Sequence, residues 1–142
     1  MRPLFRSIAV MSGLFAIAAI WYFVALPSRA DAAGAQERVI RSEALGNGPG
    51  AQLTAVVVSY APGGKSPSHR HSGSVFAYVL SGAIRSQNSA TGPVKVYAAG
   101  ESFFEPAGSI HLVSENASDT QPATMLAVFV APTGSQLTSA NH

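Results

Sequence analysis

Turn-forming residues interrupt the chain so often after residue 37 that no helical repeat is sustained there. Gly, Pro and Asn cluster at 46–50, 61–64, 91–93 and 106–108. Between these and smaller turns lie short apolar or alternating runs, which are typical of strands: 38–44, 53–60, 75–80, 83–87, 94–98, 102–105, 110–114 and 124–130. Turns this frequent indicate a sandwich or a barrel, so the sequence predicts an all-β fold.

The rest of the composition fits one compact domain. The chain has 142 residues, of which 47% are hydrophobic and only 11% are charged, unlike a disordered chain. There is no internal repeat of fixed period and no linker that would divide the strand-rich region. We expect one β-barrel over residues 33–131, followed by a flexible tail from Pro132 to His142 that is rich in Thr, Ser and Asn.

The first 32 residues form a separate segment. Arg2 and Arg6 precede an apolar stretch from Ile8 to Leu26, and the small-residue triplet at 30–32 has the A-x-A pattern of a cleavage site for exported proteins. The sequence therefore predicts a signal peptide over residues 1–32, with a mature chain that begins near Ala33.

A membrane anchor is the alternative for the same segment. The apolar stretch is about 19 residues long, which is nearly enough for a hydrophobic helix to span a bilayer, and Trp21 and Tyr22 are placed like interfacial anchors. Either way the domain is exported. It is expected to be periplasmic or extracellular, or else anchored and facing the non-cytoplasmic side.

Charge and cysteine content exclude several classes of protein. After residue 32, six basic residues balance six acidic ones: Arg38, Arg41, Lys65, Arg70, Arg85 and Lys95 against Glu37, Glu43, Glu101, Glu105, Glu115 and Asp119. A net charge near zero gives no electrostatic reason to bind nucleic acid. Because the chain has no cysteine, any metal must be held by nitrogen and oxygen.

Three of the four histidines are the candidate metal ligands. His69 and His71 lie one residue apart, so on a strand they share one face at a separation of about 7 Å. His111 follows a Pro-Ala-Gly turn, and we expect it to complete a site with the first two. His142 belongs to the expected flexible tail and is left out.

The segments around these histidines resemble the two motifs of the cupin superfamily. The first motif runs from Gly63 through His69-Arg70-His71 to Gly82, and the second runs from Gly100 through Pro106-Ala107-Gly108 to His111, with Asn116 close behind. The similarity covers residues 39–131 and is to a small, single-domain, type-2-like cupin. It implies a double-stranded β-helix, or jelly-roll barrel, with a metal bound by His69, His71 and His111.

The glutamate of the first cupin motif is missing from this sequence. Its expected place is taken by Val75, and the neighbouring Phe76 cannot bind a cation either. Glu105 is the best replacement, because it directly precedes the turn before His111. It is expected either to bind the metal or to orient a histidine. The alternative is a turn residue that is solvated or accepts from a backbone N–H or from Arg85.

A divalent ion held by three neutral imidazoles would keep open coordination positions and uncompensated charge. Such a site suits Fe, Zn, Ni, Cu or Mn. It should favour a small, anionic, chelating molecule.

Further pocket residues are expected near the ion. Val75 should face it. The aromatic residues Phe76, Tyr78, Phe103 and Phe104 could shape a pocket for an aromatic ligand or belong to the core or an interface. Two polar residues of the next strand, Arg85 and Gln87, could bind a substrate carboxylate or form a polar outer face.

Three classes of function stay open on the sequence alone. The first is a metal-dependent enzyme, with a dioxygenase-type oxidoreductase as one option. The second is a non-catalytic module that binds or senses a metal or a small molecule, and the third is a structural barrel with a vestigial site. The expected partners are a small molecule and, as an option, a second copy of the chain in a homodimer. Contact with a membrane is expected only through residues 1–32.

Overall fold

The computed structural model describes residues 34–48 and 50–141. The hydrophobic helix expected over residues 1–32 lies outside the described part of the chain. Within that part, every regular element is a strand, which confirms the all-β prediction. No helix that could cross a membrane is found among the described residues.

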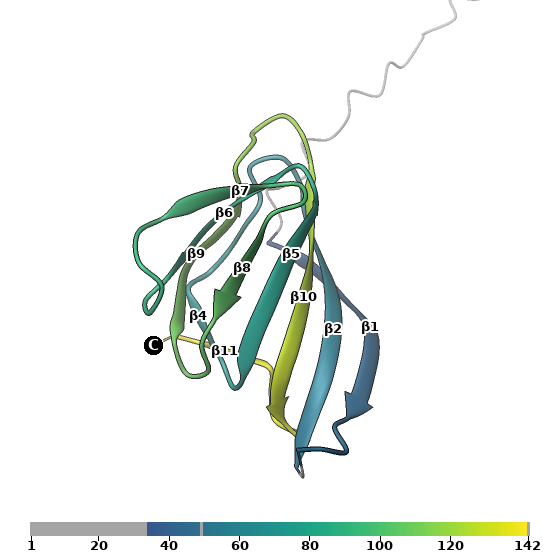
Figure 1. Cartoon of the computed structure of the whole chain (residues 1–142). Helices are drawn as coiled ribbons and strands as arrows, with labels where there is room; N and C mark the ends of the chain where they lie inside the picture. Colours follow the sequence, from purple (N-terminus) through teal and green to yellow (C-terminus); the bar gives the residue numbers. More distant parts are fainter. Residues whose placement is uncertain (1–33, 49, 142) are drawn as a thin grey trace, which may run out of the picture.

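Two antiparallel sheets pack face to face (Figure 1). One sheet has the order β1-β2-β10-β5-β8 and the other has the order β11-β4-β9-β6-β7, with β3 paired to β9. The strands are β1 (Gln36–Ala44), β2 (Ala51–Tyr60), β3 (Lys65–Ser66), β4 (His69–His71), β5 (Ser74–Ser81), β6 (Ala83–Asn88), β7 (Lys95–Ala98), β8 (Ser102–Glu105), β9 (Ile110–Asn116), β10 (Ala123–Pro132) and β11 (Thr138–Ala140).

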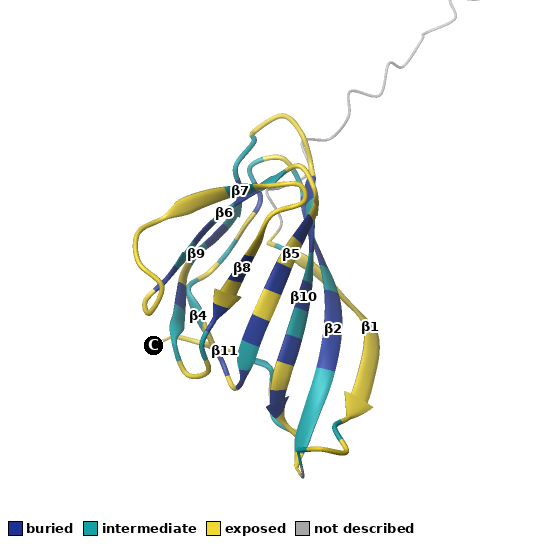
Figure 2. Cartoon of the chain, viewed as in Figure 1, coloured by how far each residue is buried: buried dark blue, intermediate teal, exposed yellow. Residues whose placement is uncertain are grey.

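Alternation along the strands creates the core. On β5 and β10, buried and less buried residues follow one another in turn, as the banded strands of Figure 2 show. Only the inward positions are apolar and buried on both strands, among them Val75, Ala77 and Val79 on β5. The core therefore fills the space between the two sheets, and the inward side chains of the histidine-bearing strands β4 and β9 face it.

The eight expected strands are all present as β1, β2 and β5 to β10. The tail differs from the expectation, because Thr138 to Ala140 form β11 and pair with β4. Leu137 also packs against the core. A flexible tail was the wrong expectation for these residues, since the open backbone edge of β4 gives them hydrogen-bond partners that are more than 60 residues away in sequence.

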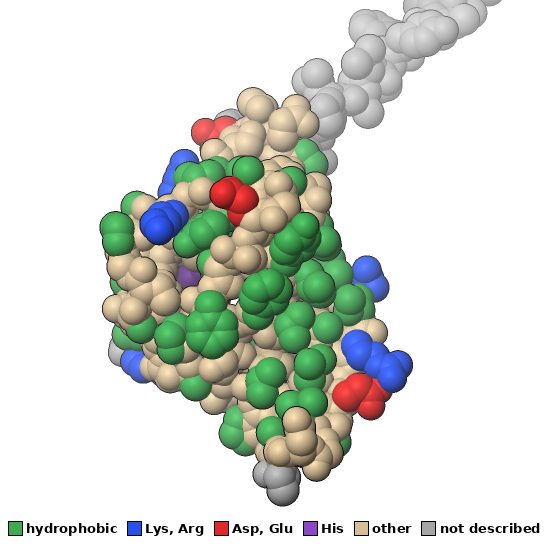
Figure 3. Space-filling view, viewed as in Figure 1, with side chains coloured by type: hydrophobic (Ala, Val, Ile, Leu, Met, Phe, Trp, Pro, Cys, Tyr) green, Lys and Arg blue, Asp and Glu red, His purple; other side chains and the backbone are tan. Residues whose placement is uncertain are grey.

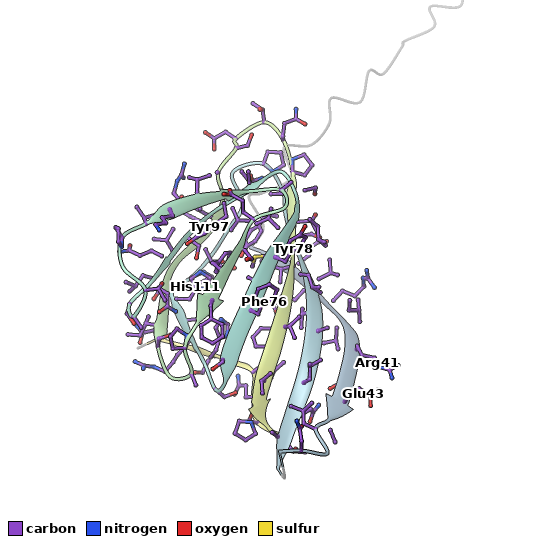
Figure 4. The ribbon with its side chains drawn as sticks, viewed as in Figure 1. Arg41, Glu43, Phe76, Tyr78, Tyr97 and His111 are labelled. Atoms are coloured by element: carbon purple, nitrogen blue, oxygen red, sulfur yellow. The ribbon has the colours of Figure 1, made fainter. Side chains whose placement is uncertain are left out.

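The outer face of the five-stranded sheet carries an exposed apolar surface. Its side chains gather over β5, β8 and β10 in the space-filling view (Figure 3). Phe76, Tyr78, Leu80, Phe104 and Val130 are each between 39% and 51% exposed. Arg41 and Glu43 on β1 form an ion pair at the edge of this face (Figure 4).

Gly82 makes the tight turn from β5 into β6. Its backbone has φ +68°, a conformation that L residues rarely adopt. A Cβ at this position would lie 2.6 Å from the carbonyl oxygen of Pro122 and 2.9 Å from the Cα of Ala123. The turn therefore needs glycine both for its backbone angle and for the close approach of the chain that leads into β10.

We predict that Gly82→Ala lowers the free energy of unfolding by about 2–4 kcal/mol, because backbone strain and a clash with main-chain atoms add together. Gly92→Ala is the matched control, since Gly92 also has a positive φ, +103°, but nothing lies within 4 Å of its added Cβ. The control should lose only about 1 kcal/mol. Urea unfolding of both variants checks this, and equal losses would contradict the proposed clash.

Candidate metal centre

Three imidazoles meet between the sheets because two strands pair in a particular register. His69 on β4 lies directly opposite His111 on β9, and His71 shares the inward face with His69. One ring nitrogen from each histidine lies within 4.8 Å of the others. His71 and His111 are 6% and 2% exposed, while His69 is half-buried. Figure 4 shows His111 between the two sheets.

Backbone carbonyls fix the tautomers of the first two histidines. His69 Nδ1 lies 2.7 Å from the carbonyl oxygen of Pro67, and His71 Nδ1 lies 3.3 Å from that of Leu137. The hydroxyl of Thr138 is also 3.2 Å from His71 Nδ1. Since a carbonyl can only accept, Nδ1–H donates in both rings and the Nε2 lone pair is left free. Metal-binding histidines are commonly held in this way.

Glu105 lies beside two of the three rings. Its carboxyl group is buried, with Oε1 3.1 Å from His111 Nδ1 and Oε2 3.8 Å from His71 Nε2. Asn88 Nδ2 donates to Oε2 at 3.1 Å. The strand ladder explains the position, because Glu105 on β8 is the direct partner of Val75 on β5.

A hydroxyl group faces the other side of the His111 ring. Ser86 Oγ lies 2.9 Å from His111 Nε2 and is buried with it. A hydroxyl can donate or accept. Ser86 therefore satisfies the ring nitrogen that points away from Glu105 in either tautomer, and it holds the ring in one orientation.

Burial sets the protonation of these groups. Burial and, to a smaller extent, the neighbouring His69 lower the pKa of His71 to about 4. Burial likewise lowers the pKa of His111 to about 3, with His69 and His71 adding to the effect. Burial raises the pKa of Glu105 to about 7, partly offset by the hydrogen bond from Asn88. Near neutral pH, His71 and His111 are thus uncharged, as metal ligands must be.

The donor set fits a divalent transition metal. The histidines and Glu105 line a small cavity of about 20 Å³ whose remaining walls include Val75, Ala77 and Phe129. Ligand nitrogens around such an ion lie about 3–3.5 Å apart, given metal–nitrogen distances near 2 Å. The observed limit of 4.8 Å is somewhat longer, so the rings have to turn inward slightly to share one ion.

Strand alternation separates the pocket residues expected from the sequence into two groups. Val75 points inward and lines the cavity. Phe76, Tyr78 and Phe104 lie on the opposite, outer face and do not line it, as Figure 4 shows for Phe76 and Tyr78. Their expected pocket role is corrected, because neighbouring residues on a strand cannot share a face.

Arg85 and Gln87 form part of a polar outer face, which was one of their two expected roles, and the alternative pocket role is corrected. They occupy the outward positions of β6, whose inward positions are Ile84, Ser86 and Asn88. Arg85 Nη1 donates to Glu115 Oε1 at 2.5 Å, so it meets neither the cavity nor Glu105.

The sequence reasoning missed three residues that touch the site. Ser86 and Asn88 contact His111 and Glu105, and Thr138 contacts His71. Of the four aromatic residues considered from the sequence, Phe103 is buried in the core, with its ring centroid 6.1 Å from that of His111. The alternation of β6 could have revealed Ser86 and Asn88, because small polar residues at its inward positions need a polar partner. No local signal indicated Thr138, whose strand pairs with a distant segment.

Comparisons with known proteins support the fold. The family model of the cupin domain matches residues 56–129, just over half of the chain. A search of curated proteins found no significant match. Among solved structures, a protein with a double-stranded β-helix domain from Klebsiella pneumoniae subsp. pneumoniae MGH 78578 is 22% identical, with a TM-score of 0.58 over 82% of this chain and 90% of that one.

Two similar structures are enzymes. The DMSP lyase DddQ from Ruegeria pomeroyi DSS-3 is 20% identical, with a TM-score of 0.54 over 63% of this chain and 43% of the lyase. Oxalate decarboxylase from Bacillus subtilis, which has Mn(II) centres, is 23% identical, with a TM-score of 0.52 over 62% of this chain and 23% of the decarboxylase. The match thus spans less than half of either enzyme, and the likeness shows the fold alone.

We predict that Glu105→Gln changes the pH dependence of stability in the metal-free protein. The pKa of Glu105 is raised from 4.5 to about 7, so its contribution to stability is fully present below pH 4.5 and is lost as the pH rises through 7. As the pH rises from about 4.5 to about 8, the free energy of unfolding of the variant should therefore increase by roughly 3 kcal/mol relative to that of the parent.

Urea unfolding in the presence of a chelator measures this difference. Glu101→Gln is the control, because Glu101 is an exposed turn residue whose carboxylate accepts from the Ala98 N–H. The free energy of unfolding of this control, plotted against pH, should run parallel to that of the parent. A Glu105→Gln curve that is also parallel would contradict a buried, neutral carboxyl group at this position.

Proposed function

This chain belongs to the cupin family, and we propose that it holds one divalent transition metal through His69, His71 and His111 and presents it to a small molecule. One observation carries the proposal: a nitrogen of each ring lies within 4.8 Å of the others, and two of the rings have Nδ1 tied to the protein. A bound ion of this kind acts as a Lewis acid that polarises a coordinated oxygen and makes bound water more acidic.

We further propose that Glu105 supplies the carboxylate that is missing at Val75. The two residues are direct partners on β5 and β8 and both point inward, so an acid at either position reaches the same space. Glu105 is also within 3.8 Å of ring nitrogens of both His71 and His111. A carboxylate there would offset part of the charge of a divalent ion, which three neutral imidazoles leave uncompensated.

The size of the cavity restricts what can approach the ion. About 20 Å³ is roughly the space of one water-sized group. Only the coordinating end of a small molecule fits there, while the rest must lie towards the solvent. Structural similarity to a lyase and to a decarboxylase supports chemistry on small molecules, and a dioxygenase-type oxidoreductase activity stays a prediction.

We also propose that the domain works outside the cytoplasm, because residues 1–32 have the pattern of a signal peptide or a membrane anchor. The homodimer expected from the sequence stays a prediction. The exposed apolar face around Phe76, Tyr78 and Phe104 is a surface of the kind that two copies could share.

We predict that the protein, purified from its native compartment without chelators, contains about one equivalent of Fe, Zn, Ni, Cu or Mn per chain. The double variant His69→Ala, His111→Ala should contain less than about a tenth of that amount, because it retains only one of the three imidazoles. Elemental analysis gives both values. His142→Ala, which changes the one histidine outside the cluster, should keep the parent content, and equal content in all three proteins would exclude this site.

We predict that Glu105→Gln weakens metal affinity by about 10- to 100-fold, as is usual when a carboxylate that binds or orients ligands is lost. Competition with a chromogenic chelator at about pH 8 measures the affinity. Glu101→Gln removes a carboxylate outside the cavity and should bind the metal as the parent does. Unchanged affinity in Glu105→Gln would remove Glu105 from the site and leave the three histidines.

A further inference from the structure

A second, larger cleft opens next to the metal cavity. It measures about 300 Å³ and lies between the start of β1, the segment that leads into β4, and β11. Its lining residues are Gly34, Ala35, Glu37, Ser66, Pro67, Ser68, His69, Thr138 and Ala140. Three of these, Glu37, Ser66 and His69, also line the metal cavity. The cleft and the metal cavity therefore adjoin at the candidate ligand His69.

The ionisable residues that line the cleft and the cavity, apart from histidine and tyrosine, are acidic. Among the residues that line the cleft and the cavity, only Glu37 and Glu105 are acidic, and none is Lys or Arg. Arg38 follows Glu37 on β1 and points to the other face of the sheet. Arg70 follows His69, and its guanidinium donates to the carbonyl oxygen of Gly108 instead. A wholly anionic molecule would thus meet the metal but no cationic side chain in the cleft.

Glu37 is the acceptor that the cleft offers to a bound donor. It is exposed and lines both the cleft and the metal cavity. A carboxylate accepts hydrogen bonds and pairs with a positive charge.

We propose that this cleft binds the protonated amine of a small molecule whose other end, a carboxylate or hydroxyl oxygen, reaches the metal. An ammonium group carries three N–H donors and a positive charge, which match the Glu37 carboxylate without a competing cation among the lining residues. The ligand class is therefore a small amino acid or amino alcohol. This inference rests on the proposed function only for the ligand oxygen that reaches the metal. Binding of the ligand amine requires only the cleft.

The negative charge of Glu37 should make the protein bind a ligand with an amine more tightly than a simple anion. The cobalt(II)-loaded protein is titrated with β-alanine and with propionate, which has the same carbon chain and carboxylate but no amine, and the visible spectrum of cobalt reports binding. We expect β-alanine to bind about five- to tenfold more tightly than propionate, as one partly exposed charged hydrogen bond allows. Glu37→Gln should bring the two affinities within about twofold of each other.

Glu43→Gln is the matched control, since Glu43 lies on the same strand and pairs with Arg41 away from the cleft. It should keep the parent preference for β-alanine. The proposal is overturned if the parent binds both probes equally well. It is also overturned if Glu37→Gln keeps the preference, because the amine would then be recognised by the metal itself.

A second measurement tests amine binding in the cleft independently of any bound metal. Ethylammonium chloride is titrated into the chelator-treated protein, and NMR follows the amide signals of Ala35, Ser68 and Thr138. Saturable shifts that disappear in Glu37→Gln support the amine subsite even if the protein binds no metal, in which case the proposed function alone fails. A protein that binds metal but shows no such shifts keeps the proposed function and loses this inference.

Discussion

The pairing of β4 with β9 is the constraint on which the site depends. It sets His69 opposite His111 across more than 40 residues of sequence, and the alternation of β4 then adds His71 to the same face. The same packing removes the rings of His71 and His111 from water and favours their uncharged forms. Carbonyls and hydroxyls supply the hydrogen bonds that water would have made, so the imidazoles are both buried and oriented.

Much of the architecture could be predicted from local patterns. Frequent turns and short alternating runs located eight strands, and the spacing of the histidines indicated which side chains would meet. The phase of β5 was harder to predict, because its apolar residues occupy both faces: Val75 points into the barrel and Phe76 out of it. An outer face as apolar as the core gives no hydropathy signal of which side is which.

Interactions between distant segments explain what the sequence did not reveal. Thr138 and the carbonyl of Leu137 orient His71 from the last strand, and nothing near residue 138 indicates a metal site. Glu105 was singled out because it precedes a turn, whereas its position follows from the β5–β8 ladder, in which it faces Val75. Hydrogen bonds from Asn88 to Glu105 and between Ser86 and His111 likewise depend on how β6 packs.

The partnership of Val75 and Glu105 has a consequence for how such barrels evolve and are classified. An acid can pass from one strand to its neighbour through two point substitutions while its carboxylate stays at almost the same place in space. A search that requires the acid at a fixed place in the first motif would then pass over a chain whose inward-facing acid lies on the neighbouring strand. Comparing which side chains converge in three dimensions would recover such chains where linear patterns lose them.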